Sequence, residues 1–135
     1  MKQEIAKNKF YEIYIDKIKN RMYLKIKGFW RHKDDVANYT NDILRATASI
    51  NSDFTLLADL SEMIAHPAEV QDIHIEAQQI LISKGLLQTA EVYESSFVQF
   101  QTLKLSGKSK MPLHQFNNTE VAEKFLDSLK TKAIL

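Results

Sequence analysis

The sequence contains no cysteine, and this absence excludes several kinds of site. Disulfide scaffolds, thiolate zinc sites, iron–sulfur clusters and cysteine nucleophiles all require that residue. Glycine is also scarce, because Gly28, Gly85 and Gly107 are the only three and each stands alone. Neither a phosphate-binding loop nor a dinucleotide fingerprint is therefore present, since both need closely spaced glycines. We predict no bound cofactor.

A strong charge of either sign is absent too: 18 basic and 17 acidic side chains leave a net charge of +1. This balance argues against nucleic acid or an anionic membrane as the main partner. No apolar run approaches the roughly 18 residues of a transmembrane segment. The opening residues 1–7 have mixed charge and lack the apolar core of a secretion signal. We expect a cytoplasmic protein.

What the sequence does contain is enough apolar material for one folded domain. Of its 135 residues, 44% are hydrophobic. A chain of this length buries about two-thirds of its unfolded surface when it folds. No linker, repeat or low-complexity tract divides it. We predict one domain over residues 1–135, with an ordered core at about residues 10–130.

Alternating or continuous apolar residues predict five strands, and apolar residues at helical spacing predict about four helices. The expected strands are 10–16, 22–27, 54–60, 89–94 and 111–116, and the expected helices are 34–50, 67–84, 95–105 and one from residue 119. The segment 95–105 also alternates like a strand, and we interpret it as a short helix. The predicted fold is α/β, in the order β-β-α-β-α-β-α-β-α. An opening antiparallel hairpin followed by right-handed crossovers gives a mixed, mostly parallel sheet.

Two segments resemble a known family. The end of the central strand reads Leu56-Leu57-Ala58-Asp59-Leu60-Ser61, and the last strand and helix share the segment 116–126, Phe-Asn-Asn-Thr-Glu-Val-Ala-Glu-Lys-Phe-Leu. With the order of elements, these resemble the SpoIIAA-like group, relatives of the STAS domains of anti-sigma-factor antagonists and transporter tails. The resemblance covers about residues 11–129 and implies a protein-interaction or regulatory role.

The sequence departs from that family at the start of the second helix. In the antagonist branch an aspartate–serine–serine–glycine stretch opens this helix, and a serine there is phosphorylated. The matching residues here are His66-Pro67-Ala68-Glu69, and no serine or threonine occurs from Glu62 to Asp72. A phosphorylation switch needs a hydroxyl near a helix N-terminus. The sequence therefore does not support the antagonist mechanism.

Polar residues gather after the central strand, where α/β sheets usually place ligands. They are Asp59, Ser61, Glu62 and His66. By residue type, Ser61, His66 and Asp59 are compatible with a hydrolytic relay, but no glycine elbow surrounds Ser61. We favour local hydrogen bonds to nearby backbone at the strand exit. The four histidines show no zinc-site spacing, so we predict no metal site.

An aromatic pair, Phe29 and Trp30, follows the second strand and precedes three basic or titratable residues. Such a pair is compatible with contact to a ligand, a lipid surface or a partner. The plainer interpretation, which we favour, is that both rings fold back over the sheet edge.

The second helix is apolar on two faces. Ile75, Ile82 and Leu86 lie nearly opposite the stripe that contains Val70 and Ala77. A domain of this size usually covers one face of such a helix, so the second stripe predicts a homodimer.

Three functional hypotheses follow. The leading one is a non-enzymatic interaction or regulatory module that acts through the second helix and the loop 61–67. The alternative is a carrier or sensor of a small apolar or lipid-like ligand, held in a cavity lined by Phe97, Phe100 and Leu103. A hydrolase is the third.

Overall fold

The computed structural model describes residues 2–134, with the side chains of residues 2–129. Over that part of the chain it has six strands, four α-helices and one 3-10 helix. The strands are β1 (Gln3–Lys7), β2 (Tyr11–Asp16), β3 (Arg21–Gly28), β4 (Phe54–Met63), β5 (Leu86–Val92) and β6 (His114–Phe116). The helices are η1 (Lys33–Val36), α1 (Tyr39–Ala48), α2 (Ala68–Ser83), α3 (Ser96–Ser109) and α4 (Thr119–Ile134).

The six strands form one mixed sheet in sequence order, β1-β2-β3-β4-β5-β6. The pairs β1–β2 and β2–β3 are antiparallel, and the pairs from β3 to β6 are parallel. The α/β class, the element order and the mostly parallel sheet predicted from the sequence are confirmed. The sixth strand, β1, lies ahead of the predicted elements. Its sequence, Gln-Glu-Ile-Ala-Lys, is short and polar, and it forms the sheet edge.

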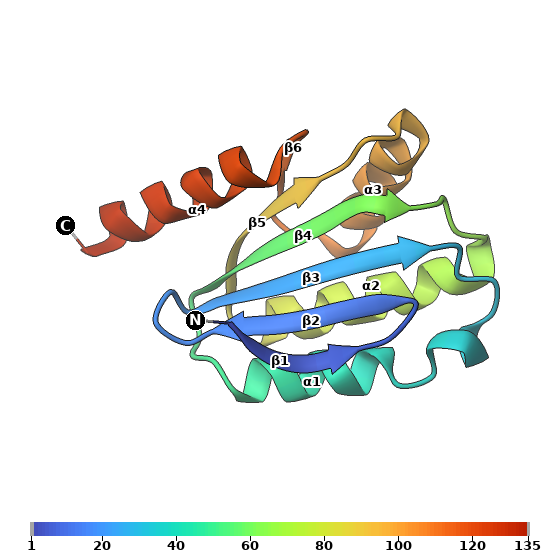
Figure 1. The fold of residues 1–135 in the computed structure, drawn as a ribbon, viewed down its shortest axis with the longest axis horizontal. Coiled ribbons are helices and arrows are strands. Elements are labelled where there is room, and N and C mark those ends of the chain that lie inside the picture. Colours follow the sequence, from blue (N-terminus) through green and yellow to red (C-terminus); the bar gives the residue numbers. More distant parts are fainter. Residues whose placement is uncertain (1, 135) are drawn as a thin grey trace.

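Helices cover the two faces of the sheet unequally (Figure 1). The main core lies between one face and the helices α1, α2 and α3, and it contains Leu24, Leu56, Ile43, Ala77 and Val98. Only α4 covers the other face, where a smaller core joins it to β3, β4 and β5. The alternation of side chains along each strand supplies both cores. No helix packs over β1 and β2 on the α4 side within the described part of the chain.

The helix boundaries differ from those expected. The predicted helix 34–50 is two pieces, η1 and α1, because Asn38 leaves helical geometry between them. Segment 95–105 is a helix, as interpreted, and it continues past Gly107 to Ser109, where Lys110 ends it with a φ of 65°. Strand β6 is shorter than the predicted strand 111–116.

Within the described residues, no helix combines the length and apolarity that a membrane span requires.

Candidate functional site

Large apolar side chains are exposed around the carboxyl ends of the parallel strands. We call this group the edge patch, and its members are Phe29, Ile64, Phe97, Phe100 and Leu103. Phe29 follows β3, Ile64 follows β4, and the others lie on α3 after β5. Phe97 and Phe100 are 80% and 65% exposed, which is unusual for phenylalanine. Apolar surface gathered in this way often marks an interaction site.

Hydrogen bonds hold the three segments of the edge patch together. The Gln101 side chain of α3 accepts from the backbone N–H of His66 at 2.9 Å and donates to its carbonyl at 2.7 Å. The Ile64 N–H donates to the Gly28 carbonyl at 3.0 Å. The Phe29 ring meets the His66 ring edge-on, with centroids 6.4 Å apart. The loop after β4 is therefore fixed to both β3 and α3.

Beneath the edge patch, two buried imidazoles stack with an indole. His66 Nδ1 and His74 Nε2 are 2.8 Å apart, and His66 Nε2 is 3.3 Å from the Gly28 carbonyl oxygen. Trp30 stacks on both rings at centroid distances of 4.9 and 4.8 Å, and its indole N–H donates to the Phe10 carbonyl. Burial lowers the pKa of His66 to about 4 and that of His74 to about 3. Both rings are thus neutral near pH 7.

This packing decides how the predicted loop residues lie. Ser61 donates through its N–H and its hydroxyl to the Asp59 carboxylate, at 3.0 and 2.6 Å, and Glu62 pairs with Lys25. His66 is buried among aromatic rings, and among the described residues no hydrogen bond joins it to Ser61. Asp59 therefore forms the local hydrogen bond to backbone favoured from the sequence, whereas the Ser61 hydroxyl bonds to the Asp59 side chain. No Ser–His–Asp relay is assembled among these residues.

The aromatic pair is divided between interior and surface. Trp30 is fully buried, so it folds back over the core and presents no surface for a ligand. Phe29 is partly exposed and belongs to the edge patch. The sequence indicates two neighbouring aromatics, and only their packing separates their roles.

The second apolar stripe of α2 is partly covered within the chain. Leu86 is the first residue of β5 and packs against the main core. Ile75 is half-buried, and Ile82 is 37% exposed at the end of the helix. Because α2 contacts both α1 and α3, less of this stripe is open than the helical pattern indicates.

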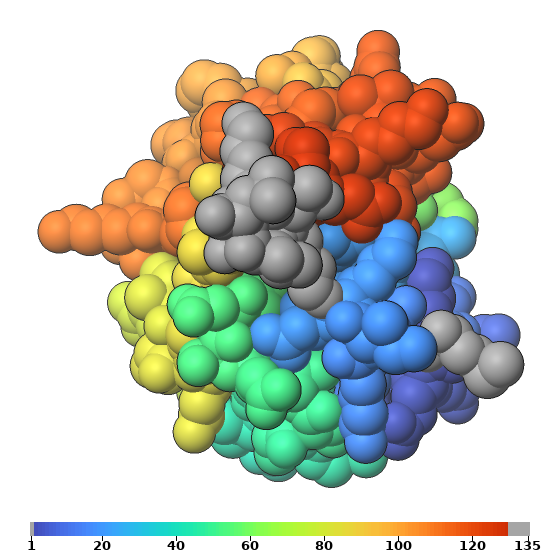
Figure 2. Space-filling model, turned by 90° about the vertical axis from the view of Figure 1, so that its left-hand side faces the viewer, coloured from blue at the N-terminus to red at the C-terminus, as the bar shows by residue number. Residues whose placement is uncertain are grey.

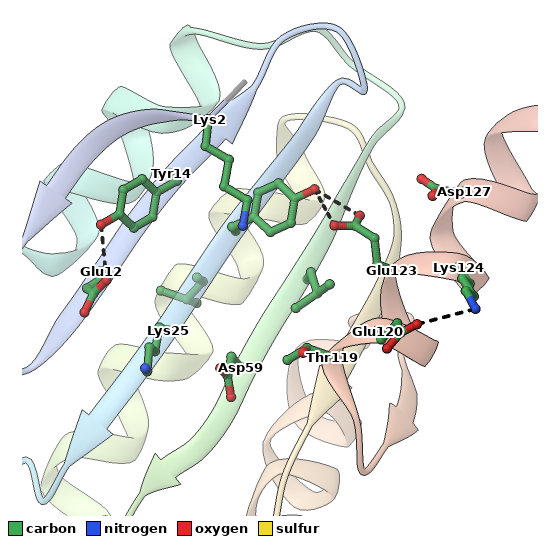
Figure 3. A pocket seen from close by; sticks show the side chains of 13 residues that line it. Lys2, Glu12, Tyr14, Lys25, Asp59, Thr119, Glu120, Glu123, Lys124 and Asp127 are labelled. Atoms are coloured by element: carbon green, nitrogen blue, oxygen red, sulfur yellow. Dashed lines mark hydrogen bonds and ion pairs between the residues drawn. The ribbon is translucent and has the colours of Figure 1, made fainter.

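A groove of about 620 Å³ lies on the other face of the sheet, between the uncovered strands and α4 (Figure 3). Tyr14 of β2 and Tyr23 of β3 lie along it. The Tyr14 hydroxyl donates to Glu12, and the Tyr23 hydroxyl contacts both carboxylate oxygens of Glu123 on α4 at 2.7 and 2.9 Å. The alternation in 10–16 and 22–27 places both tyrosines on the polar face of the hairpin, but no pattern in the sequence indicates the groove itself.

Ion pairs to one buried arginine fasten α4 beside the groove. The Arg21 side chain is fully buried, donates to Thr55 at 2.8 Å, and pairs with Glu123 and with Asp127. Figure 2 shows α4 lying directly beside the hairpin of β2 and β3 at this end of the molecule. One wall of the groove is therefore held in place by ion pairs in which the arginine is buried and both carboxylates are partly exposed.

A cavity of about 30 Å³ lies in the main core between the sheet, α2 and α3. Glu91 of β5 reaches it and is 3% exposed, and its Oε1 has no hydrogen-bond partner. Burial raises the pKa of this carboxyl to about 7. The cavity has room for one or two water molecules and no more. Phe97, Phe100 and Leu103 are not among its lining residues and face outward from α3.

Neither protein-family models nor curated proteins match the sequence. Solved structures do match its fold. An uncharacterised protein of the DUF3478 family with a SpoIIAA-like fold, from Shewanella loihica, aligns over 90% of this chain and 97% of its own, with a TM-score of 0.63 and 15% identity. SiaC of Pseudomonas aeruginosa aligns over 86% of this chain and 99% of its own, with a TM-score of 0.56 and 10% identity. The chain has the SpoIIAA-like fold.

Proposed function

We propose that this protein is a non-enzymatic interaction module that binds a partner protein through the edge patch. The observation that carries the proposal is the exposure of Phe97 and Phe100 on a helix that is clamped to the loop after β4. Aromatic side chains on a rigid base dominate binding energy at protein interfaces, because little conformational entropy is lost when they are buried. The SpoIIAA-like fold is consistent with such a role.

The main core gives less support to the carrier hypothesis. Pockets for small molecules usually enclose about 300–1,000 Å³, whereas the cavity beside Glu91 has about 30 Å³. A lipid-like ligand would have to separate α2 and α3 from the sheet, and the contacts among those elements oppose this.

The residues at the start of α2 support a module whose binding is not regulated by phosphorylation of this helix start. Pro67 precedes the helix, and Glu69 occupies its first turn. Because residues 62–72 contain no hydroxyl side chain, partner binding is expected to proceed without a phosphate there.

Self-association through α2 is a second proposal with narrower support, the exposure of Ile82. A two-fold pair of α2 helices would bury this side chain and the outer part of Ile75. We further propose a cytoplasmic location, which rests on composition alone.

The test of the edge patch is site-specific photo-crosslinking in the cells of origin. Benzoylphenylalanine replaces Phe97 on α3 in one variant and Leu44, which is exposed on α1, in the control. We expect a protein adduct from position 97 and none from position 44. An adduct at twice 15.6 kDa identifies self-association, and a different mass identifies a partner.

The adduct is then checked with purified proteins. Phe100→Asp places a charge in the patch without touching the core, and we expect it to lower affinity for the crosslinked protein at least tenfold. Ile82→Glu is the matched change on α2. Loss of binding with Ile82→Glu but not with Phe100→Asp would move the interface to α2, and unchanged binding in both would refute an apolar interface.

A further inference from the structure

The groove beside α4 contains a cation that the chain itself supplies. Lys2 lies just before β1, and its Nζ is 4.0 Å from the centroid of the Tyr23 ring. Figure 3 shows the Lys2 side chain reaching down into the groove between Tyr14 and Glu123. An ammonium group over an aromatic face is attracted by the ring's quadrupole. The face of Tyr23 is thus a place where positive charge is favoured.

The other two ammonium groups of the groove are engaged elsewhere. Lys25 pairs with Glu62, and Lys124 pairs with Glu120. Lys2 is exposed, and among the described residues no carboxylate pairs with it. Among the described residues, the Lys2 ammonium therefore contacts the Tyr23 ring and pairs with no carboxylate, and a cation–π contact at an exposed site is weak.

The groove does not suit an anion, although a helix begins at its edge. In a helix without a cap, the first backbone N–H groups are free to bind an anion. Here the N–H groups of Glu120 and Val121 already donate to the Asn118 side chain. Glu120 adds a negative charge to the first turn of α4. Both features oppose phosphate or carboxylate at this position.

The Tyr23 ring is well prepared to receive a cation. Its hydroxyl is fixed by the Glu123 carboxylate, so the ring has one orientation. Because Glu123 also pairs with Arg21 and Lys19, the attraction for a cation comes from the ring face and not from an unpaired carboxylate. The groove continues past Tyr23 towards Lys25 and Asp59. Its volume of about 620 Å³ has room for several side chains of a bound segment beside the position of Lys2.

We propose that this groove binds a segment of a partner protein that places an arginine side chain over Tyr23, and that Lys2 is an internal competitor for that position. Arginine is favoured over lysine because its planar guanidinium stacks on the ring and is less strongly hydrated. This proposal does not depend on the edge patch, because none of the edge-patch residues lines the groove.

The test uses a labelled synthetic peptide with one arginine flanked by glycine and serine, and NMR titration of the isotopically labelled protein. Matched peptides have glutamate or norleucine in place of the arginine. We expect amide shift changes at Tyr14, Tyr23 and Glu123 with the arginine peptide only. Equal shifts with the glutamate peptide, or shifts confined to α3, would overturn the proposal.

Variants separate competition from a general charge effect. Lys2→Ala should raise the peptide's affinity about two- to fivefold, because the ring face is then empty. Lys17→Ala removes the same charge from an exposed turn residue outside the groove and should leave the affinity within error. No gain with Lys2→Ala, or an equal gain with both variants, would refute the competition.

The ring itself is tested with two substitutions. Tyr23→Phe keeps the aromatic face and should keep the gain from Lys2→Ala, whereas Tyr23→Leu should abolish the gain. Phe97→Ser in the edge patch should not alter peptide binding. Peptide binding that is lost with Phe97→Ser would place the peptide on the edge patch and overturn the groove proposal alone.

Discussion

At the scale of single residues, the buried titratable groups control how stability depends on pH. Glu91 has a pKa raised by burial from 4.5 to about 7. Because the native state then binds more protons than the unfolded state between these values, stability is present at low pH and is lost as the pH rises through the window.

Glu91→Gln should therefore stabilise the protein at pH 8 by about 1–3 kcal/mol and have little effect at pH 4, since the amide keeps the shape without the cost of ionisation. Urea unfolding at both pH values measures the difference. Glu94→Gln, an exposed change just after β5, is the control. A destabilised Glu91→Gln at pH 8 would contradict the burial of an ionised carboxylate.

The imidazole pair acts in the opposite direction. The pKa values of His66 and His74 are lowered below 6.5 by burial, so the unfolded state is protonated first as the pH falls. Stability is present above pH 6.5 and is lost towards pH 4.

This acid loss should be visible in the fluorescence of Trp30, which stacks on both rings and is the only tryptophan. In the Glu91→Gln background, the urea concentration at the unfolding midpoint should decrease as the pH is lowered from 6.5 to 4. His74→Phe should be less stable at pH 7 and should flatten that fall, while His32→Gln, at an exposed histidine, should not. If the midpoint of the Glu91→Gln protein did not change between pH 6.5 and 4, the two imidazoles would not be buried in their neutral form.

At the scale of the elements, two glycines have opposite roles in neighbouring segments. Gly85 joins α2 to β5 with a φ of +100°, and an added Cβ would lie 2.7 Å from the Ser52 Cβ. Gly107 lies inside α3 with no atom within 4 Å of an added Cβ. The first position requires glycine for both conformation and space.

Alanine substitutions should separate these two cases. Gly85→Ala should destabilise the protein by more than about 1 kcal/mol, because the left-handed conformation and the contact with Ser52 both oppose a side chain. Gly107→Ala should stabilise it by up to about 1 kcal/mol, as alanine favours the helix. Thermal unfolding of both variants is the measurement, and effects of the same sign would contradict this assignment.

At the scale of the whole molecule, the open surfaces outweigh the interior as places for binding. The interior cavity has about 30 Å³, and the groove beside α4 has about 620 Å³. The helices leave part of one sheet face uncovered because α4 alone packs on it.

Native mass spectrometry of freshly purified protein tests whether the interior holds a bound small molecule. We expect the mass of the polypeptide, or twice that mass, with no additional few hundred daltons, because the core has no space for a lipid-like ligand. An excess mass that disappears on denaturation would contradict this expectation and favour the carrier.

The sequence predicted the fold well because its information is local. Alternation in 10–16 and 22–27 identifies the hairpin, and the helical spacing in 67–84 identifies α2. Strand β1 was missed because a polar edge strand has no such pattern. The hydrogen bonds between Asp59 and Ser61 were predictable because the two residues are close in sequence.

The sequence by itself determined the α/β class, the order of the elements after β1, and the polar and apolar sides of the hairpin strands β2 and β3. Only the tertiary structure decided that Trp30 is buried against His66 and His74 while Phe29 is exposed. It also decided that Lys2 meets Tyr23, and that α3 turns its phenylalanines outward. The reason is physical: side-chain periodicity is set by the local backbone, whereas these contacts join distant segments that meet only after packing.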